Sequence, residues 1–332
     1  MNDGFEKFAR RRALKIIGTG LAVAVHPIAG WAQEFPSKLM TLIVPFAAGG
    51  PTDVTARLFA KAISDELKQQ VVVDNRPGAG GLLGGGVVAR ATPDGYTLLW
   101  GGTSTLAVAP SLYTKMPYDP FKSFQPVSRA LRGPLVLVVN SKLQVNTLSE
   151  LITLAKAKPG QLNFGSAGAG SIIHLTGELL KSQAKIDIHH IPYKGNAQVL
   201  TDLAAGVLDM AFIALGHVLS HLHDPNLRAI AISSLERNPL APNLPTLAES
   251  GLPGFESMEW FGLVAPRGIP PQALERLNMA FRSASEQPQL RESIAKLGYT
   301  PIKESPEQFY DAMRVDGQKW RTVVTSANIQ PH

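Results

Sequence analysis

The chain has 332 residues, of which 45% are hydrophobic and 17% are charged, and its formal net charge is +6. This length suits two domains of ordinary size, and the apolar fraction is enough for packed cores. The absence of cysteine excludes disulfides, thiolate metal sites and a cysteine-linked lipid anchor. Residues 1–32 hold five of the 32 basic residues and two of the 26 acidic ones, which leaves a net charge of +3 for the rest. That balance does not favour nucleic-acid binding.

Residues 1–32 have the pattern of a secretory signal. Residues 10–12 are all arginine, an apolar run without acids covers 16–29, and Gly30-Trp31-Ala32 suits cleavage before Gln33. The paired arginines followed by Leu-Lys are typical of the twin-arginine (Tat) variant. The alternative is a membrane-anchoring helix, but the run is shorter than the ~20 residues that span a bilayer. We therefore expect export to the periplasm and removal of the segment.

After the signal, strand-like and helix-like patterns alternate, which predicts an α/β fold with a largely parallel sheet. Strands are expected at residues 39–46, 71–73, 96–100, 135–139, 189–192, 210–213, 227–232 and 260–265. Helices are expected from about Thr52 and after the turn at 75–81. Capping-box patterns, which mark helix starts, occur at 147–150, 246–249 and 305–308.

Two segments share the order strand, glycine-rich loop, helix start. The first covers residues 42–58 and the second covers 162–180. A helix N-terminus presents unpaired N–H groups and the positive end of a dipole, and glycine lets an anion approach the backbone closely. Facing each other, the two loops would form a cleft for a carboxylate or phosphate. The alternative is that the glycines serve tight turns only.

Several side chains near these loops can contact a ligand. The hydroxyls of Thr52, Ser166 and Ser171 can donate or accept hydrogen bonds. Asp53 could hold a ligand amine or hydroxyl, but an acid in a first helical turn is also an ordinary cap. His174 could donate to a ligand oxygen or belong to the core.

Other motifs do not meet the requirements of the chemistry they suggest. The glycines within 77–86 lack the Rossmann spacing and a well-placed acid, and Ser166 is not in a Gly-x-Ser-x-Gly elbow. The histidines at 189, 190, 217, 221 and 223 lack the acids of a metal-binding frame. We therefore expect no cofactor, no metal and no catalytic residue.

A series of motifs extends over nearly the whole chain after the signal, in the order 36–38, 43–53, 75–81, 93–99, 118–120, 163–166, 190–195, 244–246 and 260–266. It includes Ile-Val-Pro-Phe-Ala-Ala-Gly-Gly-Pro-Thr-Asp at 43–53 and Asn-Arg-Pro-Gly-Ala-Gly-Gly at 75–81. Together they resemble the solute receptors of tripartite tricarboxylate transporters, the Bug family.

The resemblance implies a type II periplasmic-binding-protein-like architecture, two α/β domains with a ligand cleft between them. Domain 1 would comprise residues 34–134 and 255–332, and domain 2 residues 135–254. Family ligands are small carboxylates held largely by backbone N–H groups and waters. By position this implies ligand contacts on one wall from Phe46, Ala47, Gly49, Gly50, Thr52, Asp53, Thr103 and Ser104. On the other wall it implies contacts from Ser166, Ala167, Gly170, Ser171 and His174.

One departure from the family's pattern concerns the ligand. Many relatives carry an acid and an asparagine after the strand at 210–213, where this chain has Ile213 and Ala214. We expect this end of the pocket to be apolar and the ligand to have an aromatic or apolar body.

The predicted function is that of a monomeric periplasmic solute receptor that captures a small carboxylate. Its partner would be a membrane permease for uptake or a sensor kinase for sensing. The alternative is an exported hydrolase acting on a small anionic substrate.

Overall fold

The computed structural model describes residues 35–221, 223–326 and 329 of the chain. The signal predicted for residues 1–32 and its cleavage position lie outside them. Among the described residues, no helix combines the length and the hydropathy that a bilayer crossing needs.

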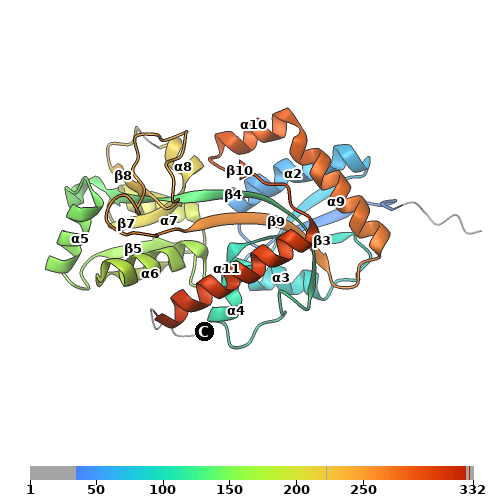
Figure 1. Cartoon of the computed structure of the whole chain (residues 1–332), viewed down its shortest axis with the longest axis horizontal. Helices are drawn as coiled ribbons and strands as arrows, with labels where there is room; N and C mark the ends of the chain where they lie inside the picture. The colour runs from blue at the N-terminus through green and yellow to red at the C-terminus, as the bar shows by residue number, and fades with distance from the viewer. Residues whose placement is uncertain (1–34, 222, 327–328, 330–332) are drawn as a thin grey trace, which may run out of the picture. The chain divides into compact units, whose positions relative to one another are not determined.

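A ten-stranded sheet runs through the described chain in the order β2–β1–β3–β9–β4–β7–β5–β6, with β8 and β10 paired to β4 (Figure 1). The first group of strands is β1 (Met40–Val44), β2 (Val71–Asn75), β3 (Thr97–Gly102) and β9 (Met258–Pro266). The second group is β5 (Asn163–Ser166), β6 (His189–Pro192), β7 (Met210–Ala214) and β8 (Leu227–Ile232). Strands β1, β2 and β3 are parallel to one another, and so are β5, β6 and β7. The predicted α/β class is confirmed.

Strand β4 (Phe124–Asn140) belongs to both groups. Its first part pairs antiparallel with β9 as far as Pro134, and its second part pairs antiparallel with β7 from Leu135 onward. The prediction of a strand at 135–139 only was too short, because Pro126 and Pro134 interrupt the strand pattern. The structure accommodates the extra length with two register shifts against β9. The change of partner falls at the predicted boundary near Leu135, while the division into two domains stays a prediction.

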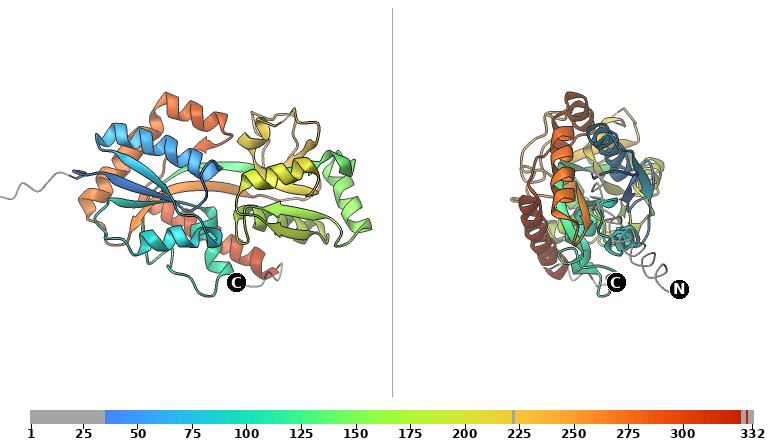
Figure 2. Two further views of the ribbon diagram at one scale, coloured as in Figure 1. Left: turned by 180° about the vertical axis from the view of Figure 1, so that it is seen from behind. Right: turned by 90° about the vertical axis from the view of Figure 1, so that its right-hand side faces the viewer.

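Helices cover both groups of strands (Figure 2). Those near the first group are α2 (Pro51–Leu67), α3 (Leu82–Ala89), α4 (Ala109–Leu112), α9 (Pro271–Glu286) and α10 (Pro288–Lys296), with the short segments η1 (Ala79–Gly81) and η2 (Thr103–Val108). Those near the second group are α5 (Leu148–Ala157), α6 (Ile172–Ala184), α7 (Asn196–Ala205) and α8 (Leu215–Leu219), with η3 (Ser141–Leu143). The last helix, α11 (Pro306–Ser326), packs against β4, α4 and α6, and the two-residue β10 (Thr300–Pro301) pairs with β4.

Aromatic packing fixes the position of α2, whose first turn faces the site. Phe59 of α2 stacks on Phe281 with ring centroids 4.9 Å apart, and Trp100 of β3 lies 5.0 Å from Phe59. The buried Trp100 Nε1 donates a 3.1 Å hydrogen bond to Thr55 Oγ1. A buried indole N–H needs such a partner, so the bond joins helix and strand at one rotation of the helix.

Two of the three capping-box patterns begin helices. Glu150 N donates to Thr147 Oγ1 at the start of α5, and Gln308 N donates to Ser305 Oγ at the start of α11. At Thr246 both capping-box bonds form with Glu249, but the chain there makes turns instead of a helix. Gly251 follows at φ +113°, a conformation that no helix contains.

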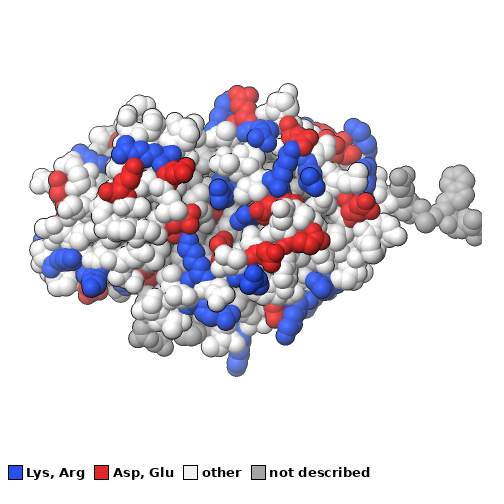
Figure 3. Space-filling view, viewed as in Figure 1, with Lys and Arg blue, Asp and Glu red and all other residues white. Residues whose placement is uncertain are grey.

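Charge on the surface is mixed. On the face drawn in Figure 3, basic and acidic side chains are interspersed over both groups of strands. This pattern agrees with the small net charge of the chain after residue 32.

Candidate ligand-binding site

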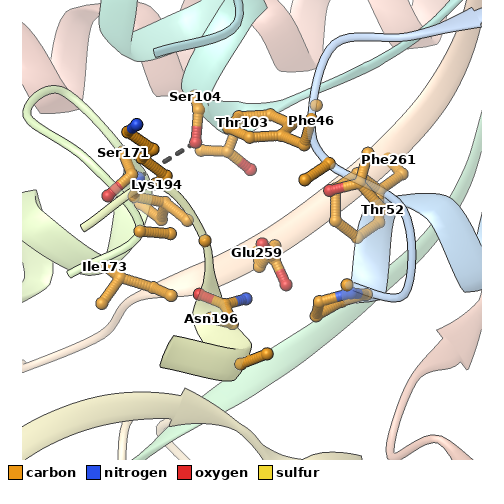
Figure 4. Close-up of a pocket in the computed structure, with 18 of the residues that line it drawn as sticks. Phe46, Thr52, Thr103, Ser104, Ser171, Ile173, Lys194, Asn196, Glu259 and Phe261 are labelled. Atoms are coloured by element: carbon orange, nitrogen blue, oxygen red, sulfur yellow. Dashed lines mark hydrogen bonds between the residues drawn. The ribbon is translucent and has the colours of Figure 1, made fainter. Parts of the chain in front are cut away.

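A cavity of about 220 Å³ opens between the two glycine-rich loops (Figure 4). Its walls come from the β1–α2 loop, the end of β3 with the start of η2, the β5–α6 loop, the β6–α7 loop, and β9. The lining residues are Phe46, Ala47, Ala48, Gly50, Pro51, Thr52, Gly102, Thr103, Ser104, Ala167, Ser171, Ile172, Ile173, Lys194, Gly195, Asn196, Ala197, Gln198, Glu259 and Phe261.

Three helices begin at the cavity wall. Helix α2 starts at Pro51, α6 at Ile172 and α7 at Asn196. The N–H groups of a first helical turn have no partner within the helix, and the helix dipole is positive at this end. Three such ends around one cavity favour an anion.

Asp53 does not line the cavity, and its carboxylate instead holds the β1–α2 loop through hydrogen bonds. Its Oδ2 accepts hydrogen bonds from Gly49 N at 2.9 Å and from Arg57 Nε at 3.0 Å, and its Oδ1 accepts one from Asn75 Nδ2 at 3.0 Å. Burial raises the pKa of this carboxyl, but the bonds from Arg57, Gly49 and Asn75 outweigh it, so the pKa lies below its ordinary value. Asp53 is therefore ionised and fully engaged in holding the loop.

The second loop rests on two stacked histidine rings and a serine, of which His174 and Ser166 are buried and His190 is half-buried. Ser166 Oγ lies 2.7 Å from His190 Nε2 and also bonds to the backbone of Gly168. The His190 ring stacks on that of His174 with centroids 3.8 Å apart, and His174 Nδ1 accepts a 3.2 Å bond from Gly170 N. The Ser166 side chain is thus occupied with the loop, and the residue is fully buried instead of facing the cavity as a nucleophile would.

The structure brings together eight of the thirteen residues predicted to contact a ligand: Phe46, Ala47, Gly50, Thr52, Thr103, Ser104, Ala167 and Ser171 line the cavity. Five do not line it: Gly49, Asp53, Ser166, Gly170 and His174. These five shape the two loops from behind. Two of them, Gly49 at φ +83° and Gly170 at φ +80°, supply left-handed turns that favour glycine.

Charged and polar residues of the cavity that the sequence did not single out come from the β6–α7 loop and β9. Lys194 is exposed at the cavity, and Asn196 Oδ1 is buried without a hydrogen-bond partner among the described atoms. Glu259 is 7% exposed. Lys194 belongs to the motif at 190–195, but no residue pattern within that motif indicates that the β6–α7 loop lies next to the two glycine-rich loops.

Burial dominates the electrostatics of Glu259. It raises the pKa of this carboxyl to about 7, although a 2.7 Å hydrogen bond from the Tyr299 hydroxyl to Oε2 acts in the opposite direction. The carboxyl of Glu259 therefore titrates near neutral pH.

The expectation that Ile213 and Ala214 form one end of the pocket is wrong. Ile213 packs in the core beside Val136 and Leu215. Ala214 meets a separate void of about 10 Å³ next to Pro51 and Tyr299. Neither residue lines the cavity between the two loops. The apolar residues that do line the cavity include Phe46, Ile173 and Phe261.

The sequence model of the tripartite tricarboxylate transporter family receptor matches residues 55–329. The chain belongs to this family of receptors. It is a solute-binding receptor and not an enzyme, so the hydrolase alternative has no support.

Solved structures of three similar proteins agree with this assignment. Rpa4515 of R. palustris, solved with adipate, is 34% identical with a TM-score of 0.86, covering 90% of this chain and 100% of that one. The periplasmic binding protein BugD is 32% identical with a TM-score of 0.85 and the same coverages. MatC of Rhodopseudomonas palustris, solved with bound malate, is 33% identical with a TM-score of 0.83, covering 87% and 100%. The predicted type II periplasmic-binding-protein-like fold is confirmed by these likenesses.

Proposed function

We propose that this receptor captures a small carboxylate in the cavity between the two glycine-rich loops. The observation that carries the proposal is the convergence of three helix starts, at Pro51, Ile172 and Asn196, on one cavity. The positive ends of the three helix dipoles stabilise an anion there without an arginine. Pro51 has no N–H, and the N–H groups of Ile172 and His174 already donate to Ser104 and Ser171, so the remaining N–H groups of these turns are the ones that can bind the anion. The similar proteins solved with adipate and with malate support a carboxylate over a phosphate.

The ligand has an apolar or aromatic body beside its carboxylate. Phe46, Ile173 and Phe261 supply apolar surface in the cavity. A second space of about 600 Å³ shares Phe46, Ala47, Ala167 and Lys194 with it and continues past Tyr113. A ligand longer than malate can extend into this space, with its body against Phe46.

Capture involves two domains, residues 34–134 with 255–332 and residues 135–254, that close around the ligand. Two hydrogen bonds between the groups of strands support this: Ser104 with Ile172, and the Tyr113 hydroxyl with the carbonyl of Ala169 at 3.3 Å. Both bonds connect segments that flank the cavity.

The receptor works in the periplasm as a monomer after export by the Tat-type signal at residues 1–32. The periplasmic location of BugD supports the compartment. The liganded receptor then meets a membrane permease for uptake or a sensor kinase for sensing.

A thermal-shift screen tests the proposed ligand class. The protein is first freed of bound solute by unfolding in guanidinium and refolding, and is then heated with malate, adipate, citrate or benzoate. A ligand at 100 times its Kd stabilises the folded state by about 2.7 kcal/mol, so a true ligand raises Tm by several degrees.

The matched controls are the neutral amides of the same compounds, which should leave Tm unchanged. A protein that refolds fully but responds to none of the carboxylates, or responds equally to the amides, would contradict the proposal.

A further inference from the structure

Glu259 is the one acidic residue among the described residues that line the cavity, and Lys194 is the one basic residue. Glu259 lies on β9, between the two glycine-rich loops. Figure 4 shows its carboxyl in the middle of the lining side chains, with Thr52 on one side and Ile173 and Asn196 on the other. A ligand in this cavity lies next to the carboxyl.

The surroundings of Glu259 offer one hydrogen bond and no ion pair within the described part of the chain. The Tyr299 hydroxyl donates to Oε2, and the pKa of Tyr299, raised by burial and by Glu259, keeps it protonated. Oε1 is left for the cavity.

Few other charged groups face this carboxyl. Lys194 faces the same cavity from the β6–α7 loop. His217 of α8 shares a small void with Tyr299, and burial and His221 lower its pKa, which favours its neutral form. Asp53 of α2 is bound to Arg57 and Asn75.

An anion in the cavity acts on Glu259 in a known direction. Burial already brings the pKa of the empty receptor's Glu259 to about 7. A carboxylate nearby disfavours the ionised form further, since like charges in a poorly solvated site repel. A protonated carboxyl, by contrast, has an O–H that can donate to the ligand.

We propose that Glu259 is the specificity-determining residue of the cavity: it is protonated in the complex and donates a hydrogen bond from Oε1 to a carboxylate oxygen of the ligand. Where Glu259 is ionised in the free receptor, each carboxylate is then bound together with one proton taken from solvent. This inference rests on the proposed function. It assigns the receptor to fully ionised acids without an ammonium group, because an ammonium would require the ionised form of Glu259.

Calorimetric titration with adipate and malate, between pH 6.5 and 9 and in two buffers of unlike ionisation enthalpy, measures the proton directly. Proton uptake should rise from about a quarter of a proton at pH 6.5 to about nine-tenths at pH 8. The Kd should increase about fivefold from pH 7 to pH 8 and about ninefold from pH 8 to pH 9, since one proton is linked to binding.

Variants of Glu259 and Tyr299 test whether the proton is taken up by Glu259. Glu259→Gln keeps a donor in its amide, so it should bind at pH 6.5 within about threefold of wild type and show neither proton uptake nor pH dependence. Tyr299→Phe removes the hydrogen bond that favours the ionised form of Glu259, which raises the pKa of Glu259 in the free receptor. The onset of proton uptake should therefore move to higher pH. Glu256→Gln, outside the cavity and paired with Lys319, is the matched control and should behave as wild type.

The outcomes separate the two proposals. Binding of adipate or malate without proton uptake, or uptake that persists in Glu259→Gln, overturns the role of Glu259 and leaves the proposed function intact. If Glu259→Gln does not fold, an unchanged onset in Tyr299→Phe overturns it instead. If no carboxylate of the thermal-shift panel binds to wild type, both proposals fail together.

Discussion

Ser104 Oγ accepts a 3.0 Å hydrogen bond from the backbone N–H of Ile172, the first residue of α6. Ser104 follows β3 in the first group of strands, whereas α6 belongs to the second group. The bond therefore connects the two walls of the cavity. It also occupies one of the N–H groups that a helix start otherwise leaves unpaired.

Replacing Ser104 with alanine should weaken both folding and binding. The Ile172 N–H is buried and would lose its partner, which costs about 1–3 kcal/mol. With the walls less firmly joined, affinity for a carboxylate should fall about 5- to 160-fold, the same free energy expressed as a ratio. Urea unfolding and calorimetry measure the two effects.

Ser111→Ala is the control for this change. Ser111 Oγ is buried in α4 and has no hydrogen-bond partner in the described part of the chain, so its removal should be neutral or stabilising. Equal losses in the two variants would show that the Ser104 bond contributes nothing specific.

Asp53→Asn should destabilise the protein by about 1–3 kcal/mol at pH 7, because the amide cannot accept all the bonds from Gly49, Arg57 and Asn75. The pKa of Asp53 is lowered in the folded state, so its contribution is present above its ordinary range and is lost as pH falls through the folded value. The difference between variant and wild type in urea unfolding should therefore shrink from pH 7 to pH 3.

The control on the same helix is Asp65→Asn. Asp65 is exposed and paired with Lys61 only, so its loss should change the free energy of unfolding very little. A deficit in Asp53→Asn that stays constant down to pH 3 would argue against a role for its charge.

Lys194→Met should lower carboxylate affinity about 3- to 10-fold at low salt and much less at high salt, because an exposed charge acts through a screened field. Titration of the variant at two ionic strengths measures this. Lys156→Met, an exposed lysine of α5 away from the cavity, should bind as wild type does. An affinity loss independent of salt would point to packing by the lysine stem instead.

Glu259 should make the protein itself less stable as pH rises. Its folded-state pKa of about 7 lies above the ordinary 4.5, so the folded state holds the proton more tightly. Its contribution is complete below pH 4.5, is lost as pH rises to 7, and is constant above that. The loss is at most about 3 kcal/mol.

Urea unfolding from pH 4 to pH 8 should show this slope in wild type and not in Glu259→Gln. The difference between the two proteins should therefore change in favour of the variant as pH rises. A difference that does not change with pH would mean that folding leaves the pKa of Glu259 at its ordinary value.

Local residue patterns were enough to predict helices and strands and the two glycine-rich loops of the site. Thr147 and Ser305 begin helices as predicted because their capping bonds involve near neighbours in the chain. The same logic was insufficient at Thr246, where the bonds form without a helix. The length of β4 was missed because its first part exists by pairing with β9, more than 100 residues later.

The sequence by itself determined the α/β class, the family and the two glycine-rich loops, since these depend on residue order and on backbone conformations that glycine and capping residues impose. Only the tertiary structure decided which residues line the cavity. It brought Lys194 and Glu259 to the cavity, placed Asp53 and His174 behind the loops, and left Ile213 and Ala214 outside the cavity lining. Such placements follow from strand pairing and burial between distant segments, which no local pattern records.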